Sequence, residues 1–179
     1  MNPVFTIGHS TRSIDEFVGL LRESDVRLVV DVRTVPRSRT NPQFNRDALP
    51  GSLQDFQIAY EHVAELGGLR GRQRNTAPSP NGFWDNQSFR NYADYALTDA
   101  FRTGLARLRH VAAERPTAIM CAEAVWWRCH RRIIADYLIA AGGTVFHIMG
   151  PGKVEAATMN PAARRLPGEG LVYPVQETP

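Results

Sequence analysis

Side chains able to carry out nucleophilic or acid–base chemistry gather in a few short segments of the sequence. A cysteine can act as a nucleophile or an acid, histidine and carboxylates can transfer protons, and arginine holds anions. By residue type, the catalytic candidates are Cys121, Glu123, His9 and Asp31. The candidates for binding an anion are Ser10, Arg33, Arg37, Cys129, His130 and Arg131.

These residues follow segments whose patterns predict buried strands. Residues 4–7, 28–32, 117–121 and 144–149 are continuous apolar runs, as in strands covered on both faces, and residues 57–63 are a further candidate strand. A helix is expected to begin at Ser13, where Ser13 and Glu16 have the spacing of a capping box. One long or two short helices are expected from Ser88 to before Pro116, with an irregularity near Thr98, and another helix at 129–141. The alternation predicts a single three-layer α/β domain over residues 1–179, with a mostly parallel, Rossmann-like sheet of five or six strands.

The sheet would bring the polar segments together, because ligands of open α/β sheets bind beyond the carboxyl ends of the strands. With a strand order of 3-2-1-4-5, the crevice would lie between the tips of the first and fourth strands and His9 would approach Cys121. The core is expected at about 4–149. The tail, 150–179, is mostly irregular in pattern, and residues 171–173 are a candidate edge strand.

The helix expected after Cys129 has no Ser, Thr, Asp or Asn as its N-cap, so its first amides need another acceptor. The Glu123 carboxylate or a bound anion could fill that role. The same helix end, with Arg128, Arg131 and Arg132, would lower the pKa of a thiol. Either cysteine could then be reactive: Cys121 is better placed for the crevice, whereas a packing role is the simpler interpretation of Cys129.

Each candidate also has a structural interpretation. Cys121 could be a small buried apolar residue, Glu123 only a helix cap, and Asp31 only an anchor for Arg33. A phosphatase-like loop from Cys121 to Arg128 is one residue longer than the C-x5-R pattern and lacks glycine. The Walker and Rossmann glycine patterns are absent as well, and no cofactor is expected.

Composition sets the broad class. The chain has 179 residues, 43% of them hydrophobic and 22% charged, which predicts a folded protein. Neither a spanning apolar run nor a signal peptide is found, so we expect a cytoplasmic protein without a membrane partner. The net charge of +3 is too small to identify a partner. Two cysteines are too few for a disulfide framework and are expected to be reduced.

Several motifs together resemble a known family. They are Thr6-Ile7-Gly8-His9-Ser10, Asp31-Val32-Arg33 with Pro36 and Ser38, Leu66-Gly67-Gly68, Tyr92-Ala93-Asp94-Tyr95, and Cys121-Ala122-Glu123 with Cys129-His130-Arg131. In this order they resemble the bacterial family catalogued as domain of unknown function 488, from about Val4 to Met149. The resemblance implies a single α/β domain and brings no activity with it. Residues 124–128 are bulkier than the link expected there.

Three functional hypotheses follow. The first is an enzyme of hydrolase or transferase type for an anionic small molecule, phosphate-bearing or nucleotide-type, with Cys121 assisted by His9, Asp31 or Glu123. The second is a non-catalytic nucleic-acid-binding module that uses the loop arginines 37, 39, 70, 72 and 74. The third is a metal-binding protein that uses Cys121, Glu123, Cys129, His130 and His9, although the two cysteines lack the usual C-x2-4-C spacing.

Overall fold

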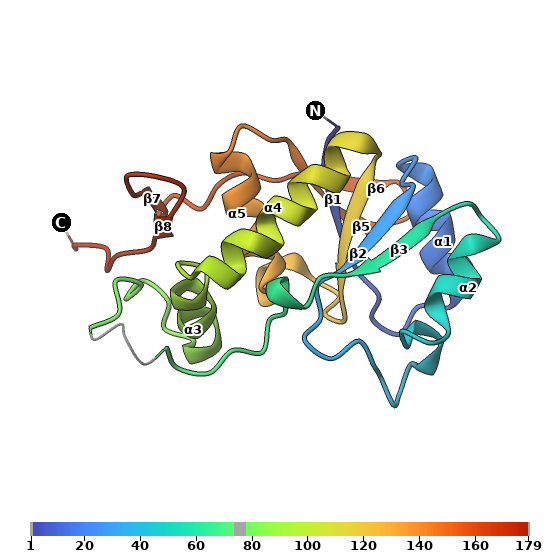
Figure 1. The fold of residues 1–179 in the computed structure, drawn as a ribbon, viewed down its shortest axis with the longest axis horizontal. Helices are drawn as coiled ribbons and strands as arrows, with labels where there is room; N and C mark the ends of the chain where they lie inside the picture. The colour runs from blue at the N-terminus through green and yellow to red at the C-terminus, as the bar shows by residue number, and fades with distance from the viewer. Residues whose placement is uncertain (1, 74–77, 179) are drawn as a thin grey trace.

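The computed structural model describes residues 2–73 and 78–178, and Figure 1 shows their path. The main sheet has six strands in the order β3-β2-β4-β1-β5-β6. Strands β1 (Val4–Gly8), β2 (Leu28–Asp31), β3 (Ala59–His62), β4 (Thr117–Cys121) and β5 (Val145–Gly150) are parallel, and β6 (Lys153–Ala156) is antiparallel to β5. The expected Rossmann-like α/β class is confirmed.

Helices cover both faces of the sheet (Figure 1). On one face, α1 (Ile14–Glu23) and α2 (Leu49–Gln54) share a core with Phe5, Ile7 and Val29. On the other face, α3 (Gln87–Tyr95), α4 (Asp99–Glu114) and α5 (Arg131–Ala140) pack with Val30 and Ile119. Neighbouring strand residues enter opposite cores because side chains alternate along a strand. The continuous apolar strands are therefore explained by burial on both sides.

Local signals fix the ends of several helices. Ser13 caps α1 and forms the complete capping box with Glu16. The irregularity near Thr98 is a true break, because Thr98 is the N-cap of α4 and separates it from α3. Short 3-10 helices lie in the connections between elements: η1 (Pro42–Phe44), η2 (Ala64–Leu66) and η3 (Trp126–Arg128).

The expected strand order is wrong by one exchange: β4, not β1, is paired with β2, and β1 lies between β4 and β5. Both strands are five residues long and fully buried, so their apolar patterns do not tell which one lies beside β2. The expected juxtaposition is still formed, because β1 and β4 are neighbours in either order. The His9 amide donates to the Cys121 carbonyl at 2.9 Å.

The tail also differs from expectation. The sixth strand of the main sheet is β6, which follows β5 after a turn at Gly152, whose φ is +64°. Residues 171–173 do not extend that sheet: β8 (Leu171–Val172) pairs with β7 (Arg164–Arg165) in a separate two-stranded sheet. The pattern of β6 was uninformative because all four of its residues are exposed.

Candidate functional site

The first cluster at the carboxyl edge of the sheet is a salt bridge that follows β2, and both oxygens of its carboxylate have protein donors. Arg33 contacts both carboxylate oxygens of Asp31, with Nε–Oδ1 at 2.9 Å and Nη2–Oδ2 at 2.7 Å. Asp31 also accepts the Arg33 amide and the Tyr60 hydroxyl. Nη2 of Arg33 also donates to the Phe44 carbonyl, and Nη1 donates to His9 Nε2. Asp31 is fully buried, so it is bound on every side by the protein itself.

His9 completes this salt-bridge cluster, which we define as His9, Asp31, Arg33 and Tyr60. Its Nδ1 lies 2.9 Å from the Ser10 carbonyl, which can only accept, so Nδ1 carries the proton and Nε2 accepts from Arg33. The ring stacks on Phe44 with 4.4 Å between centroids. Burial and the nearby Arg33 charge outweigh the hydrogen bond to Ser10 and lower the pKa of His9. Neutral His9 therefore supports Arg33.

Ser10 shapes the turn after β1. Its φ of +47° lies in the left-handed region, and its amide donates to the Ala122 carbonyl at 3.1 Å. The preceding Gly8 lies directly against the loop that follows β4, where a Cβ atom would collide with the Glu123 carbonyl. This close contact explains why glycine precedes His9 and fixes the loop from Cys121 to Ala124 against β1.

The second cluster contains the two thiols. Cys121 ends β4, Cys129 precedes α5, and their sulfur atoms lie 2.7 Å apart although both cysteines are free. Both are buried yet line the same cavity. The chain between them turns through η3, and the Glu123 carbonyl accepts a 2.7 Å hydrogen bond from Arg131 Nη2. This cluster, Cys121, Cys129, His130 and Arg131, is called the thiol cluster below.

Hydrogen-bond donors converge on Cys129 rather than on Cys121. The amide and Nε of Arg131 each lie 3.4 Å from Cys129 Sγ, and His130 Nδ1 lies 3.5 Å away. Burial alone would raise the pKa of Cys129, but the hydrogen bond from Cys121 and the adjacent His130 and Arg131 lower it well below its ordinary value. Burial and the hydrogen bond to Cys129 raise the pKa of Cys121. These directions favour a thiolate at Cys129 over one at Cys121, with the Cys121 thiol as the donor between the two sulfurs.

His130 is oriented for proton transfer to and from Cys129. Its Nε2 lies 2.7 Å from the Val32 carbonyl and must donate to it, which leaves Nδ1 as the nitrogen that faces the sulfur and can exchange a proton with it. Gly68 packs so closely against the ring that a Cβ atom there would collide with it, and Tyr92 contacts the ring edge-on with 5.0 Å between centroids. These contacts lock the ring in place.

Arg131 is almost fully buried and anchors the back of the thiol cluster. Its Nη1 donates to Thr6 Oγ1 at 3.3 Å, and Thr6 Oγ1 forms a 2.7 Å hydrogen bond with His147 Nδ1. His147 stacks on Trp126 with 4.5 Å between centroids. Burial and the Arg131 charge lower the pKa of His147 to about 4. A neutral imidazole thus ends a hydrogen-bonded chain that holds the guanidinium against Cys129.

The N-terminus of α5, which the sequence predicted to need another hydrogen-bond acceptor, lacks the usual side-chain cap. The N-cap residue of α5 is His130, and its side chain makes no capping hydrogen bond. Instead, the sulfur and the carbonyl of Cys129 accept the amides of Arg131 and Arg132. The Glu123 carboxylate is exposed and makes no hydrogen bond among residues 2–73 and 78–178; only its carbonyl is used.

A cavity of about 520 Å³ opens over the tips of β2 and β4 and contains the thiol edge of the site. Arg37 and Arg128 line it with exposed side chains that donate no hydrogen bond within the described part of the chain. Arg33 also lines it, but its guanidinium is committed to Asp31. The cavity therefore joins a thiolate to two available cations. It is lined by Arg33, Thr34, Val35, Arg37, Gly68, Leu69, Asn86, Ser88, Phe89, Cys121, Ala122, Glu123, Arg128, Cys129 and His130.

The predicted site residues thus divide between two places. Cys121, Glu123, Arg33, Arg37, Cys129 and His130 line the cavity, whereas Asp31, His9, Ser10 and Arg131 lie behind or beside it. Sequence reasoning gave Arg128 only a supporting charge and missed Gly68, Asn86 and Ser88. Asn86 carried a usable signal, since it is a typical helix cap and accepts the Ser88 and Phe89 amides.

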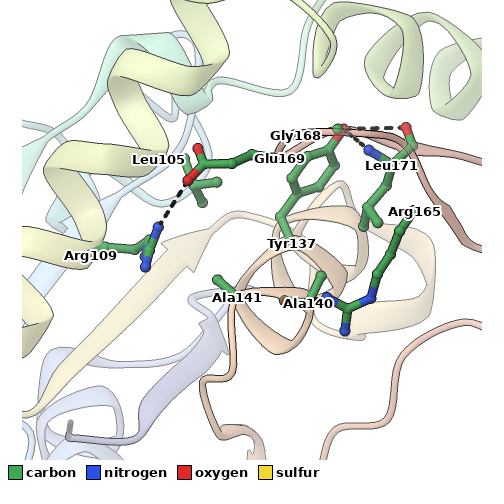
Figure 2. Close-up of a pocket in the computed structure, with 10 residues that line it drawn as sticks. Leu105, Arg109, Tyr137, Ala140, Ala141, Arg165, Gly168, Glu169 and Leu171 are labelled. Atoms are coloured by element: carbon green, nitrogen blue, oxygen red, sulfur yellow. Dashed lines mark hydrogen bonds and ion pairs between the residues drawn. The ribbon is translucent and has the colours of Figure 1, made fainter.

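A second cavity, of about 240 Å³, lies between α4, α5 and the β7–β8 turn, away from the thiols (Figure 2). Arg109 and Glu169 form an ion pair across it at 3.7 Å, and the Tyr137 hydroxyl contacts backbone atoms of Leu171. Arg165 donates to the Ala140 carbonyl. Its lining contains no cysteine or histidine, so this cavity offers no comparable chemistry.

The loop arginines expected to contact nucleic acid are not equivalent. Arg70 donates to the Gly67 and Ala64 carbonyls, and its guanidinium lies 3.9 Å from the centre of the Tyr95 ring. Arg37, Arg39 and Arg72 are exposed, and Arg74 lies outside the described residues. Arg70 therefore fixes the loop, and the nucleic-acid hypothesis rests on fewer residues than the sequence suggested.

The donor atoms proposed for a metal site do not converge either. No group of three or more His, Cys, Asp or Glu side chains suited to a metal ion occurs among residues 2–73 and 78–178. His9 is turned toward Ser10 and Arg33, and the Glu123 carboxylate points to solvent. Within that same part of the chain, no helix is long and apolar enough to cross a membrane.

The fold and the site define an α/β protein with a buried pair of thiols beside an arginine-lined cavity at the sheet edge. A family model described as "Domain of unknown function DUF488" matches residues 13–138, so the chain belongs to this family, as its motifs indicated. The match includes the thiol cluster but not His9, Ser10 or His147. Neither a search of curated proteins nor a search of solved structures found a match.

Proposed function

We propose that this protein is an enzyme that uses the Cys129 thiolate as a nucleophile toward a small anionic molecule bound in the 520 Å³ cavity. The observation that carries the proposal is the convergence of Cys121, His130 and both Arg131 donors on one sulfur atom at the cavity floor. A thiolate is the reactive form of cysteine, and such surroundings favour it. Phosphate-bearing or nucleotide-type molecules are the first substrates to test.

The roles follow from position. Cys129 would attack an electrophilic atom of the substrate, and the bond to the leaving group would break with its electron pair. The imidazolium of His130 would give a proton to that leaving group through Nδ1, and later take one from the incoming acceptor. Cys121, expected from sequence to be the nucleophile or the acid, lines the same cavity and would donate a hydrogen bond to Cys129. Its assignment as the attacking atom is the less favoured alternative.

Arg37 and Arg128 are the groups proposed to bind the anion. Both are exposed on the cavity wall, whereas Arg33 and Arg131 are held by Asp31, Cys129, Thr6 and the Glu123 carbonyl. Arginine suits this task because its planar fork matches carboxylate and phosphate oxygens. A cytoplasmic location would keep both thiols reduced.

Alkylation of the native full-length chain tests this proposal. The rates for anionic iodoacetate and neutral iodoacetamide would be measured at each cysteine by peptide mass spectrometry across pH, and normalised to the unfolded chain. We expect Cys129 to react faster than Cys121, to stay reactive below the pH of ordinary thiol titration, and to favour iodoacetate. Arg37→Gln and Arg128→Gln should reduce that preference, whereas exposed Arg39→Gln, outside the cavity lining, should not.

Two results would contradict the proposal. One is a Cys129 that reacts no faster than in the unfolded chain. The other is a preference for iodoacetate that is absent, or that survives in the double variant of Arg37 and Arg128. His130→Gln adds an independent check, because glutamine can still donate to the Val32 carbonyl but offers no basic nitrogen to the sulfur. Loss of reactivity in this variant is the expected result.

A further inference from the structure

We propose that Cys121 and Cys129 act as a dithiol pair that exchanges with small anionic disulfides, so that the electrophilic atom in the cavity is sulfur. This inference rests on the proposed function, because it uses the same thiolate and the same two arginines. The geometry that points to it is the 2.7 Å separation of two free sulfurs at the floor of an open, cationic cavity.

The separation of the sulfurs is shorter than ordinary contact between nonbonded sulfur atoms, and it is set by well-anchored backbone. Cys121 is the last residue of β4, and this strand is paired with β1 on one side and with β2 on the other. The amide of Cys129 donates to the Trp126 carbonyl, and α5 begins two residues later. A bond between the sulfurs would therefore require little backbone movement, which is the condition for a resolving cysteine.

The two sulfurs differ in a way that assigns the order of steps. The amide and Nε of Arg131 both donate to Cys129 Sγ, whereas the Cys121 thiol is paired with Cys129 Sγ and lies 3.8 Å from the Glu123 carbonyl. Cys129 is thus the attacking sulfur. Cys121 remains protonated until Cys129 has become part of a mixed disulfide and can no longer accept its proton.

The exchange then balances without another reactant. Cys129 attacks one sulfur of R–S–S–R, the S–S bond breaks, and the first R–S⁻ leaves and takes the proton held at His130 Nδ1, which is left neutral. Cys121 gives its proton to His130 Nδ1 and attacks Cys129 Sγ, which expels the second R–S⁻, and this thiolate is protonated by His130. The sum is one disulfide reduced to two R–SH, with the protein dithiol oxidised to a Cys121–Cys129 disulfide.

The oxidised pair should also be easy to reduce again. Oxidation removes the thiolate charge while Arg131 stays buried against the sulfurs, so its guanidinium would lose the negative charge beside it. Charge stabilisation of the thiolate favours the reduced form, as in dithiol oxidants of other folds. This asymmetry favours a reactive disulfide over a structural one.

Charge selects the substrate. Arg37 and Arg128 are the available cations beside the sulfurs, and Glu123 is the one carboxylate among the described residues that line the cavity. The lining thus carries a net positive charge even without the committed Arg33. Disulfides with carboxylate groups should bind and react faster than neutral ones, and cationic ones should be slowest.

Three disulfides of similar size provide the test: 3,3′-dithiodipropionate, 2-hydroxyethyl disulfide and cystamine, which are anionic, neutral and cationic. Each is added to the reduced full-length protein, and intact mass is followed over time. We expect loss of two hydrogens without retained adduct, at a rate about ten times higher for the anionic than for the cationic disulfide. Cys121→Ser should accumulate the mixed disulfide on Cys129, and Cys129→Ser should lose the fast phase.

The outcomes separate this inference from the proposed function. Suppose that Cys129 shows fast, anion-selective alkylation but wild-type protein stops at the mixed disulfide, or the cationic disulfide reacts as fast as the anionic one. The exchange is then excluded and the thiolate enzyme stands. If fast alkylation is itself absent, both fail. Cys121→Ala provides a second trapping variant should Cys121→Ser not fold, and Arg39→Gln is the control for charge outside the cavity.

Discussion

Two clusters at the same sheet edge each place a histidine and an arginine beside an acidic group, a carboxyl in one and a thiol in the other, with opposite results. In the salt-bridge cluster, each oxygen of Asp31 is matched by donors from Arg33 and Tyr60, so nothing is left for a ligand. In the thiol cluster, one sulfur receives several donors and still borders a cavity. Ionisable residues at a strand tip therefore indicate a site only when their partners leave one group reactive and accessible.

Because Asp31 is fully paired and closed to ligands, the salt-bridge cluster is predicted to contribute mainly to the stability of the fold. Arg33→Leu leaves the Asp31 carboxylate buried without its main partner, which should lower the free energy of unfolding by about 3–5 kcal/mol. Urea unfolding at neutral pH measures this change. Much of the loss should be recovered in the double variant Asp31→Asn/Arg33→Leu, which removes the stranded charge. A loss below about 1 kcal/mol for Arg33→Leu would show that the bridge is not a structural element.

Substitutions in the thiol cluster should instead change the reactivity of Cys129. Arg131→Met removes the guanidinium and one donor from Cys129 Sγ while keeping an unbranched side chain. The pKa of Cys129 should rise, so the pH profile of its alkylation moves upward and its rate at pH 7 falls about 10- to 100-fold. Arg132→Met is the matched control, because Arg132 stacks on Trp84 and donates to the Trp127 carbonyl without contacting the sulfur. Equal pH profiles for the two variants would count against the assigned role of Arg131.

The sequence was sufficient to predict the α/β class and the juxtaposition of His9 with Cys121, because apolar runs and strand-end polarity are local patterns. Strand order was beyond it, since β1 and β4 are equally apolar and only tertiary pairing distinguishes them. The exposed strand β6 was missed for a related reason: its residues carry no burial pattern.

For the site, residue type gave the candidates but not their partners. Arg33 and Arg37 look alike in the sequence, yet one is held by Asp31 and the other faces the cavity. The sequence favoured a packing role for Cys129 because its donors cannot be recognised there. They are the amide and side chain of Arg131, and their directions depend on how α5 begins. Hydrogen-bond and ion-pair partners are set only in the folded chain, and they decide which ionisable group stays reactive.

A third and smaller effect is expected in the pH dependence of stability, through buried groups near the thiol cluster. The pKa of His147, lowered by burial and by Arg131 to about 4, lies below its ordinary value near 6.5. Between these values the unfolded chain binds more protons than the folded one, so this residue makes stability fall as pH falls from 6.5 to 4. Buried Asp136, with its pKa raised to about 6, acts in the opposite direction, and its contribution is lost as pH rises toward 6.

His147→Asn removes the first of these contributions, since asparagine can still accept from Thr6 but cannot be protonated. Relative to wild type, the variant should gain about 2 kcal/mol in unfolding free energy between pH 7 and pH 4.5. Urea unfolding at both pH values measures this difference, and Asp136 cancels because it is present in both proteins. His110→Asn, at an exposed position on α4, should show no such gain. An unchanged pH dependence for His147→Asn would mean that His147 is protonated beside Arg131, and the chain through Thr6 would then not hold the guanidinium against Cys129.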